Sequence, residues 1–405
     1  MTDYVEEIKN RVLAQMDVSR NMSDEEIQTL IDESIAEKDI IRPSLKKREA
    51  AREQVFYALR GLDILQELIN DPEITEIMVN GYEHIFYEKG GCLFQWDRQF
   101  VSRDRLEDTI QSIVAAGNRM VNEAVPIVDT RLRDGSRVNI VLSPIAVDGS
   151  VVTIRKFPAH PMQMKDLLAR GSLSEEIAEF LKRLVQAGYN MFVSGGTGSG
   201  KTTFLNALSG YIPVSERVIT IEDSAELQLN GIPNLVRLEM RAANLENVAE
   251  ISIRQLIRTA LRMRPDRILV GECRGAEALD MLQAMNTGHD GSLSTGHANS
   301  CQDMLSRLET MVLMGMELPV NAIRGQIASG IDILIHLGRL RDRTRKVLDI
   351  MEIEGIFQGE ICLKPLYRFE ETGEQNGKIA GEWKRLGKLA HMEKLLAAGL
   401  ETGYA

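Results

Sequence analysis

The segment NMFVSGGTGSGKTTFLNAL, residues 190–208, joins an apolar run to a glycine-rich loop and then to a helix-forming run. It contains the phosphate-loop pattern, with two glycines five positions apart followed by lysine and threonine. Glycines let backbone N–H groups surround phosphate oxygens, and the N-terminus of the next helix adds a favourable potential. We therefore expect a nucleotide to bind at Gly195, Gly196, Thr197, Gly198, Ser199, Gly200, Lys201, Thr202 and Thr203.

Two side chains of this loop have specific expected roles. Lys201 should bridge the β- and γ-phosphates, and the hydroxyl of Thr202 should ligate Mg²⁺. The alternative is a glycine-rich turn between strand and helix that binds nothing. The agreement of strand, loop and helix in one segment favours a phosphate site.

Two further apolar runs end in carboxylates. RVITIED ends in Glu222 and Asp223, with Glu226 three residues further on, and DRILVGE ends in Glu272. Ligands of open parallel sheets bind beyond the carboxyl ends of the strands, so both ends should lie beside the phosphate loop. Glu272 is long enough to take the proton of an attacking water. The alternatives are solvated or helix-capping carboxylates at the first site and a pair with Arg274 at the second.

Two of the six histidines lie in GHDGSLSTGHANS, residues 288–300. SLSTGHA reads as a short strand that presents His297, whereas His289 lies in the turn before it. Zinc would need three or four ligands, and neither a third histidine nor a cysteine other than the isolated Cys301 is near. We expect His297 to donate to the γ-phosphate. His289 is either part of this site or an ordinary loop histidine.

A helical stripe of arginines precedes the strand that ends in Glu272. Arg254, Arg258 and Arg262 recur every four residues in ISIRQLIRTALRMRPD, which places them on one helical face. The stripe is compatible with a solvated surface and equally with a subunit interface.

Composition excludes several classes of protein. The chain has 405 residues, 44% of them hydrophobic and 26% charged, as in soluble globular proteins. No apolar run approaches the roughly 18 residues of a membrane span, and the polar start differs from a signal peptide, so we expect a cytosolic protein. The four cysteines form no C-x-x-C pair, which favours reduced thiols. A net charge of -11 argues against tracking along nucleic-acid phosphates.

The pattern of apolar residues predicts four segments. Residues 1–60 should form a helical appendage, and residues 61–158 an α+β domain whose strands flank one helix. Residues 159–172, with two prolines nearby, should form a linker. Residues 173–405 should form an α/β domain with a mainly parallel sheet, followed by hairpin-like strands and a terminal helix.

Four motifs occur in order: GGTGSGKTT, TIEDSAEL, LRMRPDRILVGECRG and TGHDGSLSTGHANS. This set resembles the Walker A motif, Asp box, Walker B motif and His box of the type II, type IV and archaeal-type secretion traffic ATPases. VPIVDTRLRDGSRVNIVLSPIAVDGSVVTIRKF resembles the end of the N-terminal domain in the CpaF branch, which serves Flp or tight-adherence pili. The resemblance covers roughly residues 60–345. It implies a RecA-like phosphate-loop motor domain and a PAS-like N-terminal domain.

The resemblance also implies roles for individual residues. Glu226 and Glu272 would handle the metal and the water, with Thr202 and Glu226 as Mg²⁺ ligands, and His297 would sense the γ-phosphate. Arginines of the N-terminal domain reach the nucleotide in related proteins, and the matching positions are Arg137 and Arg155. Both would otherwise be read as strand surface charges. The four-cysteine zinc motif of many pilus ATPases is absent, which fits the CpaF branch and removes zinc from the expected cofactors, ATP and Mg²⁺.

The expected function is therefore a hexameric ATPase that powers Flp or type IV-like pilus assembly or secretion at the cytoplasmic face of the membrane, with inner-membrane platform proteins as partners and no nucleic acid. One alternative is a nucleic-acid translocase or recombinase-like ATPase, because one fold serves several functions. Another is a nucleotide-binding scaffold without turnover. The acidic charge disfavours the first alternative, and the retention of Lys201 and Glu272 disfavours the second.

Overall fold

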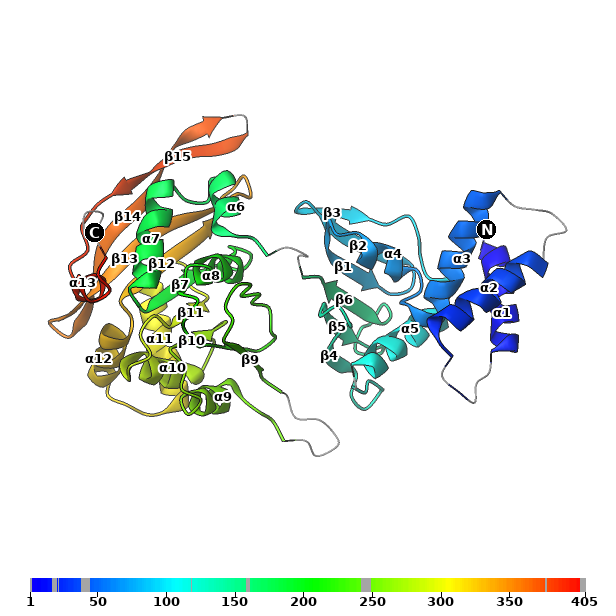
Figure 1. Cartoon of the computed structure of the whole chain (residues 1–405), viewed down its shortest axis with the longest axis horizontal. Coiled ribbons are helices and arrows are strands. Elements are labelled where there is room, and N and C mark those ends of the chain that lie inside the picture. The colour runs from blue at the N-terminus through cyan, green and yellow to red at the C-terminus, as the bar shows by residue number, and fades with distance from the viewer. Residues whose placement is uncertain are drawn as a thin grey trace. The chain divides into compact units, whose positions relative to one another are not determined.

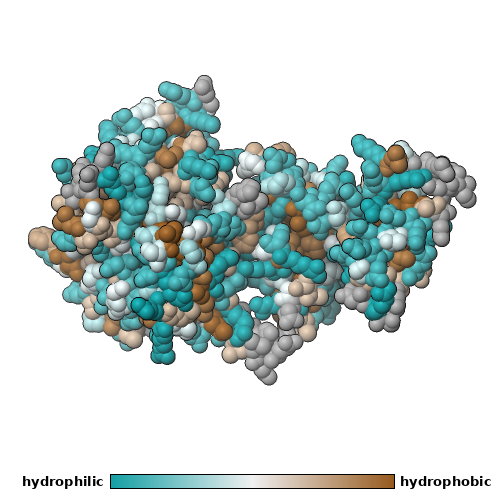
Figure 2. Space-filling view, in the orientation of Figure 1, coloured by the Kyte–Doolittle hydropathy of each residue, from teal (hydrophilic) through white to brown (hydrophobic). Residues whose placement is uncertain are grey.

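The structure, a computed structural model, describes residues 2–16, 20, 22–37, 44–117, 119–157, 161–241, 249–375 and 377–400. The chain divides into two units, Met1–Ala159 and His160–Ala405 (Figure 1). None of the helices in the described ranges is both long and apolar enough to span a bilayer. On the face seen in Figure 2, hydrophilic residues cover most of the surface and hydrophobic ones form separate patches.

The first unit begins with three helices, α1 (Thr2–Gln15), α2 (Asp24–Glu37) and α3 (Leu45–Arg60). Their apolar residues recur at helical spacing and face one another, so that Ile8, Ile27, Ile31 and Val55 are fully buried in a core of their own. These helices occupy the segment for which the sequence predicts a helical appendage.

The rest of the first unit is an antiparallel sheet with two helices, α4 (Leu65–Asn70) and α5 (Arg103–Ala116). The strand order is β3-β2-β1-β6-β5-β4. Alternate residues of the strands, such as Val138 and Ile154, share a core with Leu106 and Ile110 of α5. The strands are β1 (Ile74–Asn80), β2 (His84–Lys89), β3 (Cys92–Gln95), β4 (Ile127–Arg131), β5 (Arg137–Val141) and β6 (Val151–Arg155).

The second unit is built on one nine-stranded sheet in the order β15-β14-β13-β12-β7-β11-β10-β8-β9. Strands β12, β7, β11, β10, β8 and β9 are parallel to their neighbours, and β12 to β15 pair antiparallel. The parallel strands are β7 (Met191–Gly195), β8 (Val218–Glu222), β9 (Leu235–Glu239), β10 (Arg267–Val270), β11 (Leu293–Gly296) and β12 (Ile333–Arg339). The others are β13 (Arg345–Phe357), β14 (Glu360–Gln375) and β15 (Lys378–Arg385).

Helices cover both faces of this sheet (Figure 1), as α/β architecture requires. One core joins the sheet to α7 (Glu175–Gln186) and α8 (Lys201–Ser209). The other core joins it to α9 (Ile253–Ala260), α10 (Glu277–Asn286), α11 (Cys301–Gly315) and α12 (Val320–Gly330). Strands β7 and β8 are buried along their whole length, as expected for parallel strands covered on both faces.

Two further segments pack against the core of the second unit. Part of the segment predicted as a linker forms α6 (Met164–Ala169), whose Met164 and Leu167 are buried in the core of the second unit. Residues 159 and 160 of that linker lie outside the described residues. The C-terminal hairpin-like strands extend the main sheet, and the terminal helix α13 (Glu393–Ala397) buries Leu395 in the same core.

Candidate active site

The glycine-rich loop connects the end of β7 to the start of α8. Gly198 and Gly200 have φ values of 71° and 94°, a left-handed conformation that favours glycine. Gly196, Thr197 and Gly198 are exposed at the tip of the loop. Backbone N–H groups at the start of α8 are thus available at the carboxyl edge of the sheet, the geometry that binds phosphate.

Lys201 begins α8 and folds back over the loop. Its ammonium donates hydrogen bonds to the carbonyls of Gly195 (3.1 Å) and Gly196 (3.2 Å), and it lies 3.2 Å from Nδ1 of His297. The side chain is almost fully buried, and this burial lowers its pKa. A phosphate that reaches the loop would offer the ammonium stronger acceptors than two carbonyls.

Glu272 lies just beyond β10, between two basic side chains. Its Oε1 is 2.8 Å from Nε2 of His297, which follows β11, and its Oε2 accepts a hydrogen bond from Nη2 of Arg274 at 2.5 Å. The pair with Arg274, expected from the sequence only as an alternative, is therefore present. His297 contacts both Glu272 and Lys201. The side chains that follow the ends of β10, β11 and β7 therefore meet at one place.

The electrostatic surroundings of His297 favour its neutral form. Burial lowers the pKa of His297, and the positive charges of Lys201, Arg274 and Arg307 act in the same direction, against the charge of Glu272. A neutral imidazole has one N–H donor and one acceptor nitrogen. It can therefore donate to a phosphate oxygen while it accepts from another group.

Glu222 and Glu226 have different environments although they are close in sequence. Glu222 is buried, and its Oε2 accepts the backbone N–H groups of Glu226 (2.7 Å) and Leu227 (2.8 Å). Burial raises the pKa of Glu222. Glu222 therefore holds the turn that carries Glu226, whose half-buried carboxylate is close enough to Arg274 to raise the pKa of that guanidinium, after the larger effect of Glu272.

Two other features of the sequence, His289 and the arginine stripe, take no part in the contacts of Lys201, His297 and Glu272. His289 precedes β11 and contacts the carbonyl of Ala284 at 3.2 Å, so the strand separates it from His297. Arg254 and Arg258 both donate from Nε to the buried Asp280 of α10, at 2.6 and 2.7 Å. These two arginines of the stripe therefore have a partner within their own chain.

Arg137 and Arg155 belong to the first unit, where the sheet places them side by side. They are directly paired across β5 and β6, and Arg131 of β4 is paired with Arg137. Paired positions share a face of the sheet, so the three arginines form a row. The side chain of Arg155 is 65% exposed, with the carboxylate of Glu76 at 4.0 Å.

The structure also contains loop contacts that sequence patterns did not reveal. Nε of Arg345 on β13 donates to the carbonyl of Gly198 at 2.7 Å. Behind the loop, the hydroxyl of Ser194 lies 2.9 Å from Nδ1 of the buried His336 on β12. Both contacts depend on the pairing of β12 with β7, for which the local sequence has no signal beyond strand propensity, and the contact of Arg345 depends also on the pairing of β12 with β13, which the hairpin-like pattern predicts.

Metal binding by side chains alone is not indicated. Within the described residues, no group of three or more histidine, cysteine, aspartate and glutamate side chains is arranged to hold a metal ion. An ion at a phosphate loop takes most of its ligands from phosphate oxygens and water, so Thr202 and Glu226 remain candidates for this role.

The chain is similar in sequence to a known protein family and to individual known proteins. Residues 58–374 match the family model described as type II/IV secretion system protein. The chain belongs to this family. Among the relatives, the putative conjugal transfer protein Rv3659c of Mycobacterium tuberculosis (strain ATCC 25618 / H37Rv) is 35% identical over 298 residues, 72% of this chain and 84% of the relative. The type IV secretion system protein VirB11 of Brucella suis biovar 1 is 34% identical over 320 residues, 71% of this chain and 88% of the relative.

A solved structure supports the fold of this family member. The pilus retraction motor PilT with bound ADP matches with a TM-score of 0.51 and 21% identity, covering 75% of this chain and 81% of PilT. This likeness shows that the chain shares the α/β fold of PilT. Neither the PAS-like assignment of the first unit nor the CpaF branch follows from it.

Proposed function

We propose that this protein hydrolyses ATP and uses the reaction to drive a pilus-assembly or secretion machine. The proposal rests on one chain of contacts, from Lys201 to His297 (3.2 Å) and from His297 to Glu272 (2.8 Å). These contacts lie where the neighbouring parallel strands β7, β11 and β10 end. An ammonium that can bind phosphate, an imidazole that can donate to phosphate and a carboxylate that can act as a base are in contact there, an arrangement that suits ATP hydrolysis.

Each group has a defined task in the proposed reaction. The N–H groups of the loop Gly195–Thr203 and the ammonium of Lys201 hold the β- and γ-phosphates. Glu272 accepts a proton from water as the water oxygen bonds to the γ-phosphorus and the bond to the β–γ bridging oxygen breaks. His297 donates to a γ-phosphate oxygen, which stabilises the charge that spreads over the transferred group.

Magnesium fits the same edge of the sheet. When bound, Mg²⁺ would neutralise charge on the β- and γ-phosphate oxygens. Thr202, the second residue of α8, and Glu226 would hold it, because hydroxyl and carboxylate oxygens suit this ion. The carboxylates of Glu272, Asp223 and Glu226 raise the pKa of the Arg274 guanidinium. This acidic edge therefore stabilises positive charge.

The wider assembly is part of the proposal. We assign the protein to the CpaF branch, with a PAS-like first unit and a RecA-like second unit, working as a homo-hexamer against platform proteins at the cytoplasmic face of the inner membrane. Membership of the secretion family and the names of VirB11 and PilT support a secretion or pilus role. Arg137 and Arg155 would complete the site from the first unit.

A nucleotide-binding and turnover assay tests the chemistry. The full chain should release phosphate from ATP, and Lys201→Ala should lose both turnover and nucleotide affinity because the ammonium contacts phosphate. Lys388→Ala, at an exposed position, is the matched control. Unchanged affinity in Lys201→Ala would contradict the phosphate-loop assignment. Capture of membrane platform proteins on the full chain then tests the partner.

A DNA titration tests the alternative function. The relative Rv3659c is named a conjugal transfer protein, so DNA is a reasonable candidate substrate to examine. With a net charge of -11 the chain lacks the counterion-release contribution that drives non-specific DNA binding, and added DNA should leave turnover nearly unchanged at physiological salt. Strong stimulation by single- or double-stranded DNA would favour a translocase.

A further inference from the structure

A cavity of about 460 Å³ adjoins the phosphate loop on the side of α11. Gly196 and Thr197 of the loop form one wall, His297 lies beside them, and Asp303 and Arg307 of α11 form the opposite wall. The cavity thus begins at the tip of the loop and ends at a helix that carries none of the sequence motifs.

Arg307 is the notable side chain of this cavity. It is exposed, and it makes no hydrogen bond or ion pair with any residue that the structure describes. Its positive charge nevertheless reaches His297, whose pKa it lowers together with burial, Lys201 and Arg274. The guanidinium therefore faces the site closely enough to act on it.

Four other basic side chains of the second unit already have partners. Lys201 donates to two carbonyls of the loop, and Arg274 pairs with Glu272 and with Asp223 (3.0 Å). Arg254 and Arg258 pair with Asp280. Arg307 thus has donors available for a ligand without breaking an existing ion pair in the described structure.

Among the described residues, Asp303 is the one acidic side chain that lines the cavity, and it lies one helical turn before Arg307. It forms no ion pair with Arg307, and its charge instead raises the pKa of His336, against the larger effect of burial. Its backbone N–H is bonded to the hydroxyl of Ser300 at 2.9 Å. Asp303 therefore reduces the positive potential of the cavity without forming an ion pair with the guanidinium of Arg307.

We propose that Arg307 binds the γ-phosphate of ATP from α11, so that this cavity is the subsite that distinguishes ATP from ADP. The inference rests on the proposed ATPase function. In the proposed reaction the terminal phosphate binds beside Lys201 and His297, which are in contact, and the cavity opens beside His297. A guanidinium presents several N–H donors in a fork that matches phosphate oxygens.

Affinities for two nucleotides test the inference without turnover. ADP and the non-hydrolysable analogue AMP-PNP are titrated by calorimetry into the wild type, Arg307→Ala and Arg307→Lys. We expect Arg307→Ala to weaken AMP-PNP binding about 10- to 100-fold, the range for loss of a charge-assisted hydrogen bond, and ADP binding less than about twofold. Arg307→Lys should fall between the wild type and alanine.

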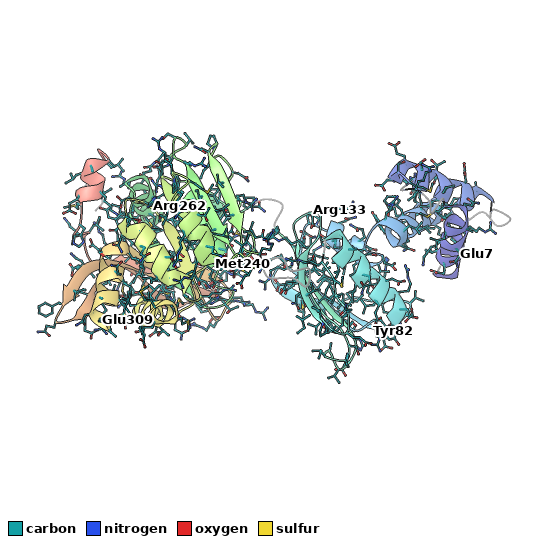
Figure 3. All side chains as sticks on the ribbon, turned by 90° about the horizontal axis from the view of Figure 1, so that it is seen from below. Glu7, Tyr82, Arg133, Met240, Arg262 and Glu309 are labelled. Carbon is teal, nitrogen blue, oxygen red and sulfur yellow. The ribbon has the colours of Figure 1, made fainter. Side chains whose placement is uncertain are left out.

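Arg262→Ala is the charge-matched control. Arg262 is exposed on the same unit, and Figure 3 shows it well apart from Glu309 of α11. It should retain the wild-type ratio of the two affinities. An unchanged ratio in Arg307→Ala, or an equal loss for both nucleotides, would overturn the inference while leaving the ATPase proposal in place. Failure of the wild type to bind either nucleotide would overturn both.

Discussion

Arg274 donates a hydrogen bond to the carboxylate of Glu272 at 2.5 Å, although only one residue separates them in the chain. The other end of the guanidinium lies 3.0 Å from Asp223, beyond the adjacent strand. Backbone N–H groups of Arg274 and Gly275 donate to Glu277, which fixes the loop after β10. Arg274 thus orients the carboxylate of Glu272, whose other oxygen faces His297.

Glu272→Gln tests the proposed base. Glutamine keeps the size of the side chain but cannot accept the proton, so ATP should still bind while turnover falls by about two to four orders of magnitude. Single-turnover phosphate release, measured beside equilibrium ATP binding, separates the two effects. Glu354→Gln, a partly exposed position on β13, is the control and should keep wild-type turnover. Near-normal turnover in Glu272→Gln would move the role of base to another carboxylate.

The sequence predicted most of the strand ends that form the site, because the motifs are local. Residues 190–208 determine strand, loop and helix within one segment, and the strands before Glu272 and His297 are short apolar runs with clear ends. The pairing of β12 with β7, which brings His336 to Ser194, involves residues 142 positions apart. Such pairing depends on tertiary packing, which no local pattern encodes.

The same limit explains the unpredicted roles of arginines. The stripe of Arg254 and Arg258 is evident from its spacing, but its partner Asp280 lies on the next helix and is identified only once the two helices pack. Arg307 falls within an ordinary amphipathic helix, and its relation to the loop appears only when α11 lies beside His297. In the sequence, Arg307 is recognisable as a charged residue ten positions after His297, and it has no further distinguishing feature.

Acidification should destabilise the fold through His336. Burial lowers the pKa of His336 below the ordinary value of 6.5, with Asp349 and Asp303 acting in the opposite direction. The unfolded chain therefore takes up a proton near pH 6.5 while the folded chain stays neutral, so this contribution to stability is lost as the pH falls from about 6.5 through the lowered pKa. Thermal unfolding between pH 7.5 and about 5 should show the loss.

Two variants isolate this effect from other titrating groups. His336→Asn removes the imidazole and should make the melting temperature less sensitive to pH in that range. Ser194→Ala removes the 2.9 Å contact but keeps the buried imidazole, so it should retain the wild-type pH dependence whatever its overall stability. Identical pH dependence in His336→Asn and the wild type would assign the loss to other groups.

Asp280→Asn should destabilise the second unit. The carboxylate is buried and accepts from two guanidinium groups, and asparagine cannot be an ion-pair partner for either. Because the side chain of Arg258 is 64% exposed and water screens its charge, we expect a loss of about 1–3 kcal/mol in chemical denaturation, below the range for fully buried pairs. Arg258→Ala should cost less, since Arg254 would remain. An unchanged denaturation midpoint in Asp280→Asn would show that these ion pairs do not stabilise the fold. The arginine stripe would then be assigned to a subunit interface.

The row of arginines on the first unit should contribute to turnover from outside the phosphate-loop unit. The transferred phosphoryl group needs cations directed at its oxygens, and arginines from another domain or subunit supply them in many NTPases. Arg137 and Arg155 are paired across β5 and β6, so one phosphate group could contact both. Arg137→Ala and Arg155→Ala should therefore fold normally but turn over ATP at least tenfold more slowly.

Mixing experiments decide whether these arginines act across a subunit boundary. Lys201→Ala lacks a working phosphate loop but keeps both arginines, whereas Arg155→Ala keeps the loop. If the first unit of one subunit serves the second unit of its neighbour, a mixture of the two inactive proteins should regain part of the activity, because some boundaries combine an intact loop with intact arginines. Arg133→Ala, at an exposed position of the same unit labelled in Figure 3, is the control and should be fully active alone. Activity independent of concentration in a protein that sediments as a monomer would exclude action between subunits. Full activity of both Arg137→Ala and Arg155→Ala would show that these arginines are ordinary surface charges.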